Sequence, residues 1–232
     1  MPVTLPPEFK ALVVGADGAL GQAFVKHLQQ DLACTDVLCL SRSADGFDLR
    51  DAASLGRLGN RLAGAGPFHL IVDATGALTI DGVGPEKSLA QLDAVALHQA
   101  MAVNAIGPVL LLRQLAPLLA RGDAIYAKLS ARVGSIGDNR KGGWYGYRAA
   151  KAALNMLLQT AAIELQRRNP MLRVVALQPG TVRSRLSQPF QAGVPALLEP
   201  EVSVAGMVRT MLALEPRQGA HFVDYKGEVI PW

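Results

Sequence analysis

The stretch that decides the fold is Ala11-Leu12-Val13-Val14-Gly15-Ala16-Asp17-Gly18-Ala19-Leu20-Gly21. Its first four residues are all apolar, as expected of a short strand buried on both faces of a sheet. Three glycines then lead directly into a segment of helical period. Glycines at such a turn let the backbone approach a pyrophosphate, and the following helix offers N–H groups and the positive end of its dipole. A tight turn without a ligand is the alternative. We predict a dinucleotide-binding turn formed by Gly15, Asp17, Gly18, Ala19, Leu20 and Gly21.

Outward from this stretch, apolar runs of strand length alternate with longer segments of helical period. The expected strands are Ala11–Val14, Val37–Leu40, His69–Asp73, Ala124–Leu129, Arg173–Leu177 and His221–Asp224. The expected helices are Leu20–Gln30, Leu89–Leu119 (one helix or two in succession), Tyr147–Arg168 and a helix between Glu201 and Leu214. This alternation is typical of a parallel sheet with right-handed crossovers. We therefore expect an α/β fold over residues 1–232: a single-domain, Rossmann-type, doubly wound parallel sheet of about seven strands with helices on both faces.

The composition and charge of the chain exclude some classes of protein. Half of the 232 residues are hydrophobic, which is enough for one sizeable core. No run of about 18 apolar residues occurs, and the first ten residues do not resemble a signal peptide, so we expect no membrane association and a cytoplasmic protein. The net charge of +4 comes from scattered Lys and Arg residues. Nucleic-acid binding, which needs basic residues on one face, is not expected.

The cysteines and histidines carry no pattern of a metal site. Cys34 and Cys39 are expected to be reduced thiols in the core of a cytoplasmic protein. The four histidines share no ligand spacing with one another or with carboxylates, so we expect them to be structural and the protein to hold no metal.

The ends of the second and third strands predict the rest of the nucleotide site. Ser41-Arg42-Ser43 ends the second strand, where Arg42 could pair with the extra phosphate of NADP(H). Asp17 is the counter-argument, because its carboxylate could face the ribose as in proteins that bind NAD(H); a solvated arginine is a further alternative. NADP(H) is therefore favoured over NAD(H). Asp48-Leu49 could reach the adenine, and Ala74-Thr75-Gly76 could let backbone approach the cofactor, although ordinary turns would look alike.

Tyr147-Arg148-Ala149-Ala150-Lys151 is the most informative stretch for chemistry. Residues four apart on a helix share a face, so the Tyr147 phenol and the Lys151 ammonium point the same way. A nearby positive charge lowers the pKa of a phenol, which is otherwise about 10. The pair could then donate a proton to a carbonyl or remove one from an alcohol. By itself such a pair is more often a solvated helix face.

Two further features accompany this pair. Pro108 cannot donate to the carbonyl of Asn104, so that carbonyl could hold a water that links Lys151 to solvent. The alternative is a proline-kinked core helix. Pro179-Gly180-Thr181-Val182 follows the fifth strand, where exposed backbone could bind the nicotinamide carboxamide, or could simply end the strand.

Taken in order, these motifs resemble the short-chain dehydrogenase/reductase family over essentially the whole chain. They are the Gly15–Gly21 loop, Asp73–Gly76, Asn104, Tyr147-x-x-x-Lys151 and Pro179-Gly180. The C-factor-like branch of that family is similar in Ser130–Asn139, Gly142–Tyr147, Phe222–Tyr225 and Ile230–Trp232. The resemblance implies a nicotinamide cofactor and a homodimer or homotetramer built partly from the helices that contain Asn104 and Tyr147.

The chain departs from the family pattern at three places. The glycines of the first loop are spaced differently, and Asp73 precedes Ala74-Thr75-Gly76 where the family has Asn-Ala-Gly. The family's catalytic serine position is Ala131. Ser130 should point away from the site, because side chains alternate along a strand. Ser135 or a water could supply the missing hydroxyl.

The resemblance implies an oxidoreductase that transfers a hydride between a nicotinamide cofactor and a small carbonyl or alcohol substrate, and Arg42 favours NADP(H) as that cofactor. Tyr147 would be the general acid/base, Lys151 would lower its pKa and bind the ribose, Asn104 would anchor a relay, and Ser135 would hold the substrate oxygen. The alternative is a sensor or signalling protein that binds NADP(H) with little turnover, which Ala131 favours.

Overall fold

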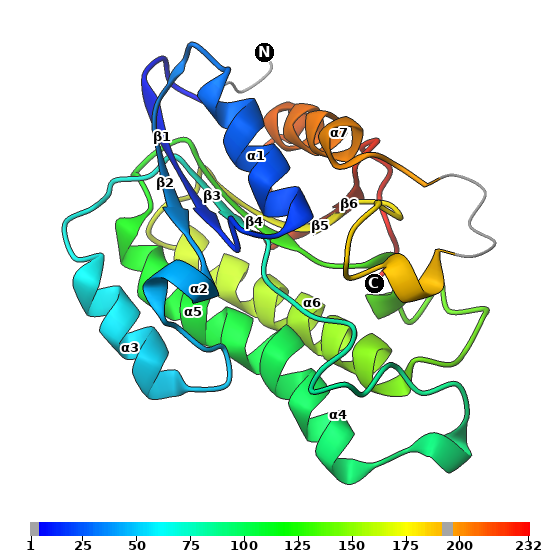
Figure 1. The fold of residues 1–232 in the computed structure, drawn as a ribbon. Helices are drawn as coiled ribbons and strands as arrows, with labels where there is room; N and C mark the ends of the chain where they lie inside the picture. Colours follow the sequence, from blue (N-terminus) through cyan, green and yellow to red (C-terminus); the bar gives the residue numbers. More distant parts are fainter. Residues whose placement is uncertain (1–4, 192–196) are drawn as a thin grey trace.

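The computed structural model describes residues 5–191 and 197–232, and within them six parallel strands form one sheet in the order β2-β1-β3-β4-β5-β6 (Figure 1). The strands are β1 (Phe9–Val14), β2 (Cys34–Leu40), β3 (Leu70–Asp73), β4 (Ala124–Leu129), β5 (Leu172–Gln178) and β6 (His221–Asp224). The chain moves from β1 to one edge, then returns to the other side of β1 and continues outward. The predicted doubly wound α/β fold is confirmed, with six strands where we expected about seven.

Helices cover both faces of this sheet (Figure 1). On one face lie α1 (Ala19–Gln29) and α7 (Pro200–Ala213), which contact each other. On the other lie α3 (Ala52–Arg61), α5 (Gly107–Leu115) and α6 (Tyr145–Gln166), with α4 (Ala94–Met101) packed against α6. Because strand side chains alternate, Leu12 and Val14 enter the core beneath α5 and α6, whereas Val13 enters the core beneath α1 and α7.

The predicted long helix Leu89–Leu119 is a composite. A 3₁₀ turn (η1, Leu89–Gln91) precedes α4, a π-helical turn (η2, Ala102–Ile106) joins α4 to α5, and a second 3₁₀ turn (η3, Ala116–Leu118) ends it. The Gly107 N–H donates to the Ala102 carbonyl, five residues earlier. Pro108 explains the wider turn, because it has no N–H with which to continue the normal pattern. Asn104 lies inside this turn.

Residues 94–118 together are long and apolar enough, by length and composition alone, to cross a membrane, although we expected no such helix. This is a weak indication, because the core helix of a soluble protein meets the same criteria. Leu111 and Leu115, on the inner face of the helix, are fully buried in the core beneath the sheet.

The expectation of two core thiols is wrong. Cys34 is half-buried, Cys39 is exposed, and both are free. The cause is topological: β2 is an edge strand, so only part of its surface is covered, whereas the sequence pattern suggested burial on both faces.

Candidate active site

The glycine turn between β1 and α1 lies at the carboxyl end of the sheet. Gly15 has φ 81°, and a Cβ there would lie 3.1 Å from the carbonyl carbon of Ala74. A Cβ at Gly21 would overlap the carbonyl oxygen of Gly15. Gly18 precedes α1 without a side-chain cap, so the first N–H groups of α1 are left for a ligand. This cradle fits the pyrophosphate of a dinucleotide.

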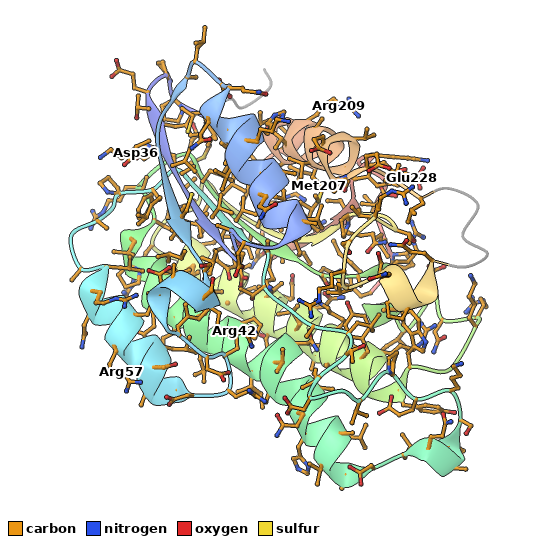
Figure 2. All side chains as sticks on the ribbon, in the orientation of Figure 1. Asp36, Arg42, Arg57, Met207, Arg209 and Glu228 are labelled. Carbon is orange, nitrogen blue, oxygen red and sulfur yellow. The ribbon has the colours of Figure 1, made fainter. Side chains whose placement is uncertain are left out.

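The predicted ribose-binding residues gather at the start of α2 (Arg42–Asp45), directly after β2. Ser43 Oγ donates to Asp17 Oδ2 at 3.0 Å, so the glycine turn and α2 meet here. Ser41 Oγ accepts from the Ala44 N–H at 3.1 Å. Arg42, labelled in Figure 2, is exposed. Among the residues described, it forms no ion pair with a carboxylate. Asp17 and the segment that contains Arg42 are thus brought together beside the glycine turn.

Asp48 and Leu49, predicted near the adenine, are held by neighbouring residues. Arg50 pairs with Asp48 at 3.2 Å and with Asp81 at 3.0 Å, and its hydrogen bonds hold the pKa of the Asp48 carboxyl below its usual value. Leu49 packs against Gly107, where a Cβ would overlap the Leu49 carbonyl oxygen. Arg50 therefore links the Asp48–Leu49 loop to the segment that contains Asp81.

The turn after β3 rests on a lysine that the sequence reasoning missed. Lys128 Nζ donates to Asp73 Oδ1 at 2.9 Å and to the Thr75 carbonyl at 2.6 Å. Neither Lys128 nor Asp73 exposes any side-chain surface. The two residues are register partners in β3 and β4. The available signal was a pair of opposite charges at the ends of two otherwise apolar strands, Leu70–Asp73 and Ala124–Leu129.

Asn104 clamps the segment that follows this turn. Its Oδ1 accepts from the Ala77 N–H at 3.0 Å, and its Nδ2 donates to the Ala77 carbonyl at 2.9 Å. A Cβ at Gly76 would lie 3.2 Å from Asn104 Oδ1 and 3.7 Å from Lys151 Nζ. Three of the predicted site residues, Gly76, Asn104 and Lys151, are therefore neighbours, although they come from three separate elements.

Tyr147 and Lys151 share a face of α6, with Lys151 Nζ 5.6 Å from the centre of the Tyr147 ring. Lys151 Nζ also donates to the Leu129 carbonyl at 3.1 Å. Burial raises the pKa of the Tyr147 phenol. Burial, with repulsion from Lys128 and against the attraction of Asp73, lowers the pKa of Lys151 to about 7. We expected Lys151 to lower the pKa of Tyr147, but in this geometry desolvation dominates at both groups.

The hydrogen bonds of Ser130 and Ser135 show where each hydroxyl points. Ser130 Oγ donates to Asn155 Oδ1 at 2.7 Å, so the Ser130 side chain points into α6 and away from the site, as the strand alternation predicted. Ser135 is buried, and its Oγ accepts from the Asp138 N–H at 3.0 Å. Ser135 thus caps its own turn. Ala131, between β4 and the following 3₁₀ turn (η4, Arg132–Gly134), offers no hydroxyl.

Beyond β5, the predicted carboxamide-binding backbone is partly paired. Gly180 has φ 79°, and the Pro179 carbonyl accepts from Ser203 Oγ at 2.6 Å. The Thr181 carbonyl accepts from the Leu198 N–H at 2.9 Å, and Val182 bridges to Leu198. These contacts tie the Pro179–Val182 turn to the start of α7.

A cavity of about 690 Å³ opens beside Tyr147 and Asn104. The segment 77–87 and α4 supply most of its wall, which is mostly apolar: Ala77, Leu78, Ile80, Val83, Pro85, Val95, Ala96 and Ala100. The charged residues Asp81, Glu86, Lys87 and Asp93 also line the cavity. Glu86 joins this wall to the start of α6, because its Oε2 accepts from the Gly146 N–H at 3.0 Å. The sequence gives no sign of this cavity, because segment 77–87 carries no motif. Among the residues described, no cluster of His, Cys, Asp and Glu could hold a metal.

Comparison with known proteins agrees with this arrangement. Residues 44–194 match the model of the family described as short chain dehydrogenase. The 1-hydroxy-2-glutathionyl-2-methyl-3-butene dehydrogenase of Rhodococcus sp. (strain AD45) is 28% identical over 232 residues, covering 95% of this chain and 98% of the relative. The C-signal protein of Myxococcus xanthus is 32% identical over 168 residues, covering 72% of this chain and 94% of the relative.

Among solved structures, a putative short-chain dehydrogenase/reductase from Burkholderia multivorans with bound NADP superposes with a TM-score of 0.80. It is 26% identical, and the match covers 97% of this chain and 100% of that one. The family match spans more than half of the chain, and the glycine turn, Asn104, Tyr147 and Lys151 lie at the carboxyl ends of the strands as the resemblance implied. The chain therefore belongs to the short-chain dehydrogenase family of oxidoreductases.

Proposed function

We propose that this protein catalyses the reversible, NADP(H)-dependent reduction of a small carbonyl compound to an alcohol. The observation that carries the proposal is the convergence of Tyr147, Lys151, Asn104 and Gly76 beside the cavity of about 690 Å³. The carboxyl ends of parallel strands are where ligands bind in such sheets. The nicotinamide, when bound, would supply or accept the hydride.

The chain's own residues would manage the proton. The Tyr147 phenol would donate its proton to the carbonyl oxygen as the substrate is reduced, and would take it back when the alcohol is oxidised. Burial makes the phenolate costly, so Tyr147 starts the reduction as the protonated acid. Lys151, protonated, would bind the ribose hydroxyls and stabilise the phenolate left behind. Asn104 would hold segment 76–77 in place through Ala77 and anchor a water relay from its carbonyl to Lys151.

The cofactor would lie along the carboxyl edge of the sheet. Its pyrophosphate fits the Gly15–Gly21 turn, with Gly18, Ala19 and Leu20 at the start of α1. The remaining contacts proposed are Asp17, Ser41 and Arg42 at the ribose, Asp48 and Leu49 at the adenine, Ala74, Thr75 and Gly76 near the ribose and nicotinamide, and Pro179, Gly180, Thr181 and Val182 at the carboxamide. Arg42 favours NADP(H), and the Burkholderia multivorans relative binds NADP. NAD(H) is the weaker candidate because Asp17, its supporting carboxylate, is already held by Ser43.

The mostly apolar surface of the cavity supports a carbonyl substrate with a large apolar part. The Arg183 guanidinium pairs with Glu199 at 2.8 Å, so it gives no support to an anionic substrate. We further propose that residues 1–232 act as one domain, that the protein is a cytoplasmic homodimer or homotetramer, and that neither nucleic acid nor a membrane is a partner.

The test is fluorescence titration of the purified protein with NADPH and with NADH, followed by a screen of aldehydes, ketones and quinones with Tyr147→Phe as the control. We expect micromolar NADPH binding, weaker NADH binding and carbonyl reduction that Tyr147→Phe slows by about 10²-fold or more. If neither cofactor binds, the proposal is wrong.

A second candidate function is an NADP(H)-binding sensor with little turnover. Ala131 favours it, because the usual hydroxyl beside Tyr147 is missing, and Ser135 is engaged with Asp138. Tight NADPH binding without reduction of any compound in the screen would select this alternative.

A further inference from the structure

The ends of β3 and β4 enclose two opposite charges. Lys128 Nζ and Asp73 Oδ1 are 2.9 Å apart, and both side chains are completely buried. The Tyr126 hydroxyl approaches the second carboxylate oxygen of Asp73 at 3.4 Å. Removing both charges from water costs free energy that their attraction only partly offsets, so a buried pair is a weak device for stability alone. Its position suggests another role.

Lys128 also holds the turn that follows β3. Its Nζ donates to the Thr75 carbonyl at 2.6 Å and lies 3.0 Å from Thr75 Oγ1. Thr75 in turn donates to Asp73 Oδ1 from its backbone N–H at 2.9 Å and from its hydroxyl at 2.6 Å. The turn is thus tied to both charges, and the next residue, Gly76, is the one whose Cβ position lies 3.7 Å from Lys151 Nζ.

Both members of this pair act on Lys151. Among the described residues, the titratable groups that act on it are Lys128 from β4, which disfavours its charge, and Asp73 from β3, which favours it. Tyr147, on the same helix, contributes a ring 5.6 Å away. The Leu129 carbonyl, one residue after Lys128, accepts directly from Lys151 Nζ.

We propose that Lys128 and Asp73 are positioning residues for Lys151: together they seat the Thr75–Gly76 turn against it and balance the charge that it carries. The proposal rests on the proposed NADP(H) function. The buried carboxylate of Asp73 requires a buried cation, and Lys128 supplies it. Neither residue touches the reacting atoms, so each acts through Lys151.

The consequence is a pH dependence with opposite signs for the two partners. Lys151 must be protonated to hold the ribose, so NADPH affinity should fall as the pH rises through the Lys151 pKa near 7. The pH at which the NADPH affinity begins to fall is the bend of this profile. Lys128→Met removes a repulsion and should move the bend to higher pH by roughly one unit. Asp73→Asn removes an attraction and should move it to lower pH. A merely structural role would weaken binding by a similar factor at every pH in both variants.

The experiment measures the dissociation constant of NADPH between about pH 6 and pH 9 for the wild type, both single variants and the double variant Asp73→Asn/Lys128→Met. The double variant removes both charges of the pair, so neither is left buried without its partner and the test stays decisive if a single variant fails to fold. Its bend is expected between those of the wild type and Lys128→Met, because repulsion by Lys128 outweighs attraction by Asp73. Lys26→Met, at an exposed position on α1, is the matched control and should leave the bend in place.

A second readout separates this inference from the proposed function. The titration of the Lys151 ammonium, followed by nitrogen NMR in the protein without cofactor, should shift in the same directions in the same variants. An unchanged Lys151 titration in the double variant would overturn the inference even if NADPH binds. Shifted titration without any NADPH binding would instead uphold the positioning role and overturn the proposed function.

Discussion

The Lys151 ammonium lies 5.6 Å from the centre of the Tyr147 ring, one helical turn away on the same face of α6. Both groups are desolvated, and desolvation penalises the charged form of each: the pKa of Tyr147 rises and that of Lys151 falls to about 7. At neutral pH the Tyr147 phenol is therefore protonated and uncharged. This is the state required of an acid that waits for a carbonyl.

Tyr147→Phe should reduce carbonyl reduction by about 10²- to 10⁴-fold, the usual contribution of a positioned general acid. The ring and its packing remain, so NADPH binding should change little. Steady-state kinetics and a parallel NADPH titration check both statements. An active Tyr147→Phe protein would mean that another group donates the proton.

Lys151→Met should stabilise the protein at pH 7. Between pH 7 and the pKa of an unfolded lysine, the unfolded chain binds more protons at this position than the folded chain, so the wild-type free energy of unfolding rises with pH in that window. Below pH 7 the folded protein carries the full free-energy cost of burying the Lys151 charge. Removing the charge should add about 2–4 kcal/mol at pH 7 and abolish this part of the pH dependence. Urea unfolding at several pH values measures it.

The same variant should lose activity, because the ribose contact and the stabilising charge are gone. Lys26→Met, which removes a solvent-exposed lysine from α1, should alter neither stability nor its pH dependence appreciably. A Lys151→Met protein less stable than the wild type at pH 7 would contradict the assignment of a desolvated lysine.

Ala131→Ser should raise kcat if the site lacks a hydroxyl, by up to about 10²-fold given the usual cost of losing one oxyanion donor. Ser135→Ala is the complementary variant, since Ser135 Oγ otherwise only caps the turn to Asp138 in the contacts described. A large loss of kcat in Ser135→Ala, together with no gain in Ala131→Ser, would identify Ser135 as the working donor.

Arg42→Ala should weaken NADPH binding about tenfold, or 1.4 kcal/mol, and leave NADH binding nearly unchanged, because only NADPH carries the phosphate that Arg42 would pair with. Asp17→Asn is the opposite test: removing a negative charge beside Ser43 should tighten NADPH binding. Isothermal titration with both cofactors is the measurement. Equal losses for NADPH and NADH in Arg42→Ala would remove the argument for cofactor preference.

The sequence alone was sufficient for the fold class and for much of the candidate site. The Gly15–Gly21 turn, the strand ends and the spacing of Tyr147 and Lys151 are local patterns, and short-range sterics and helix periodicity determine what they become. Gly21, for instance, leaves no room for a Cβ against the Gly15 carbonyl. Family membership followed from the order of these motifs.

The tertiary structure alone decided which distant groups meet and how deeply they lie. Lys128 is 55 residues from Asp73 in the chain, yet strand register makes them partners. The exposure of Cys39 depends on β2 being an edge strand, the cavity depends on segment 77–87 folding over α4, and the pKa directions of Tyr147 and Lys151 depend on burial. Desolvation and charge–charge interactions act through space, so a linear pattern can nominate such residues but cannot determine their environment.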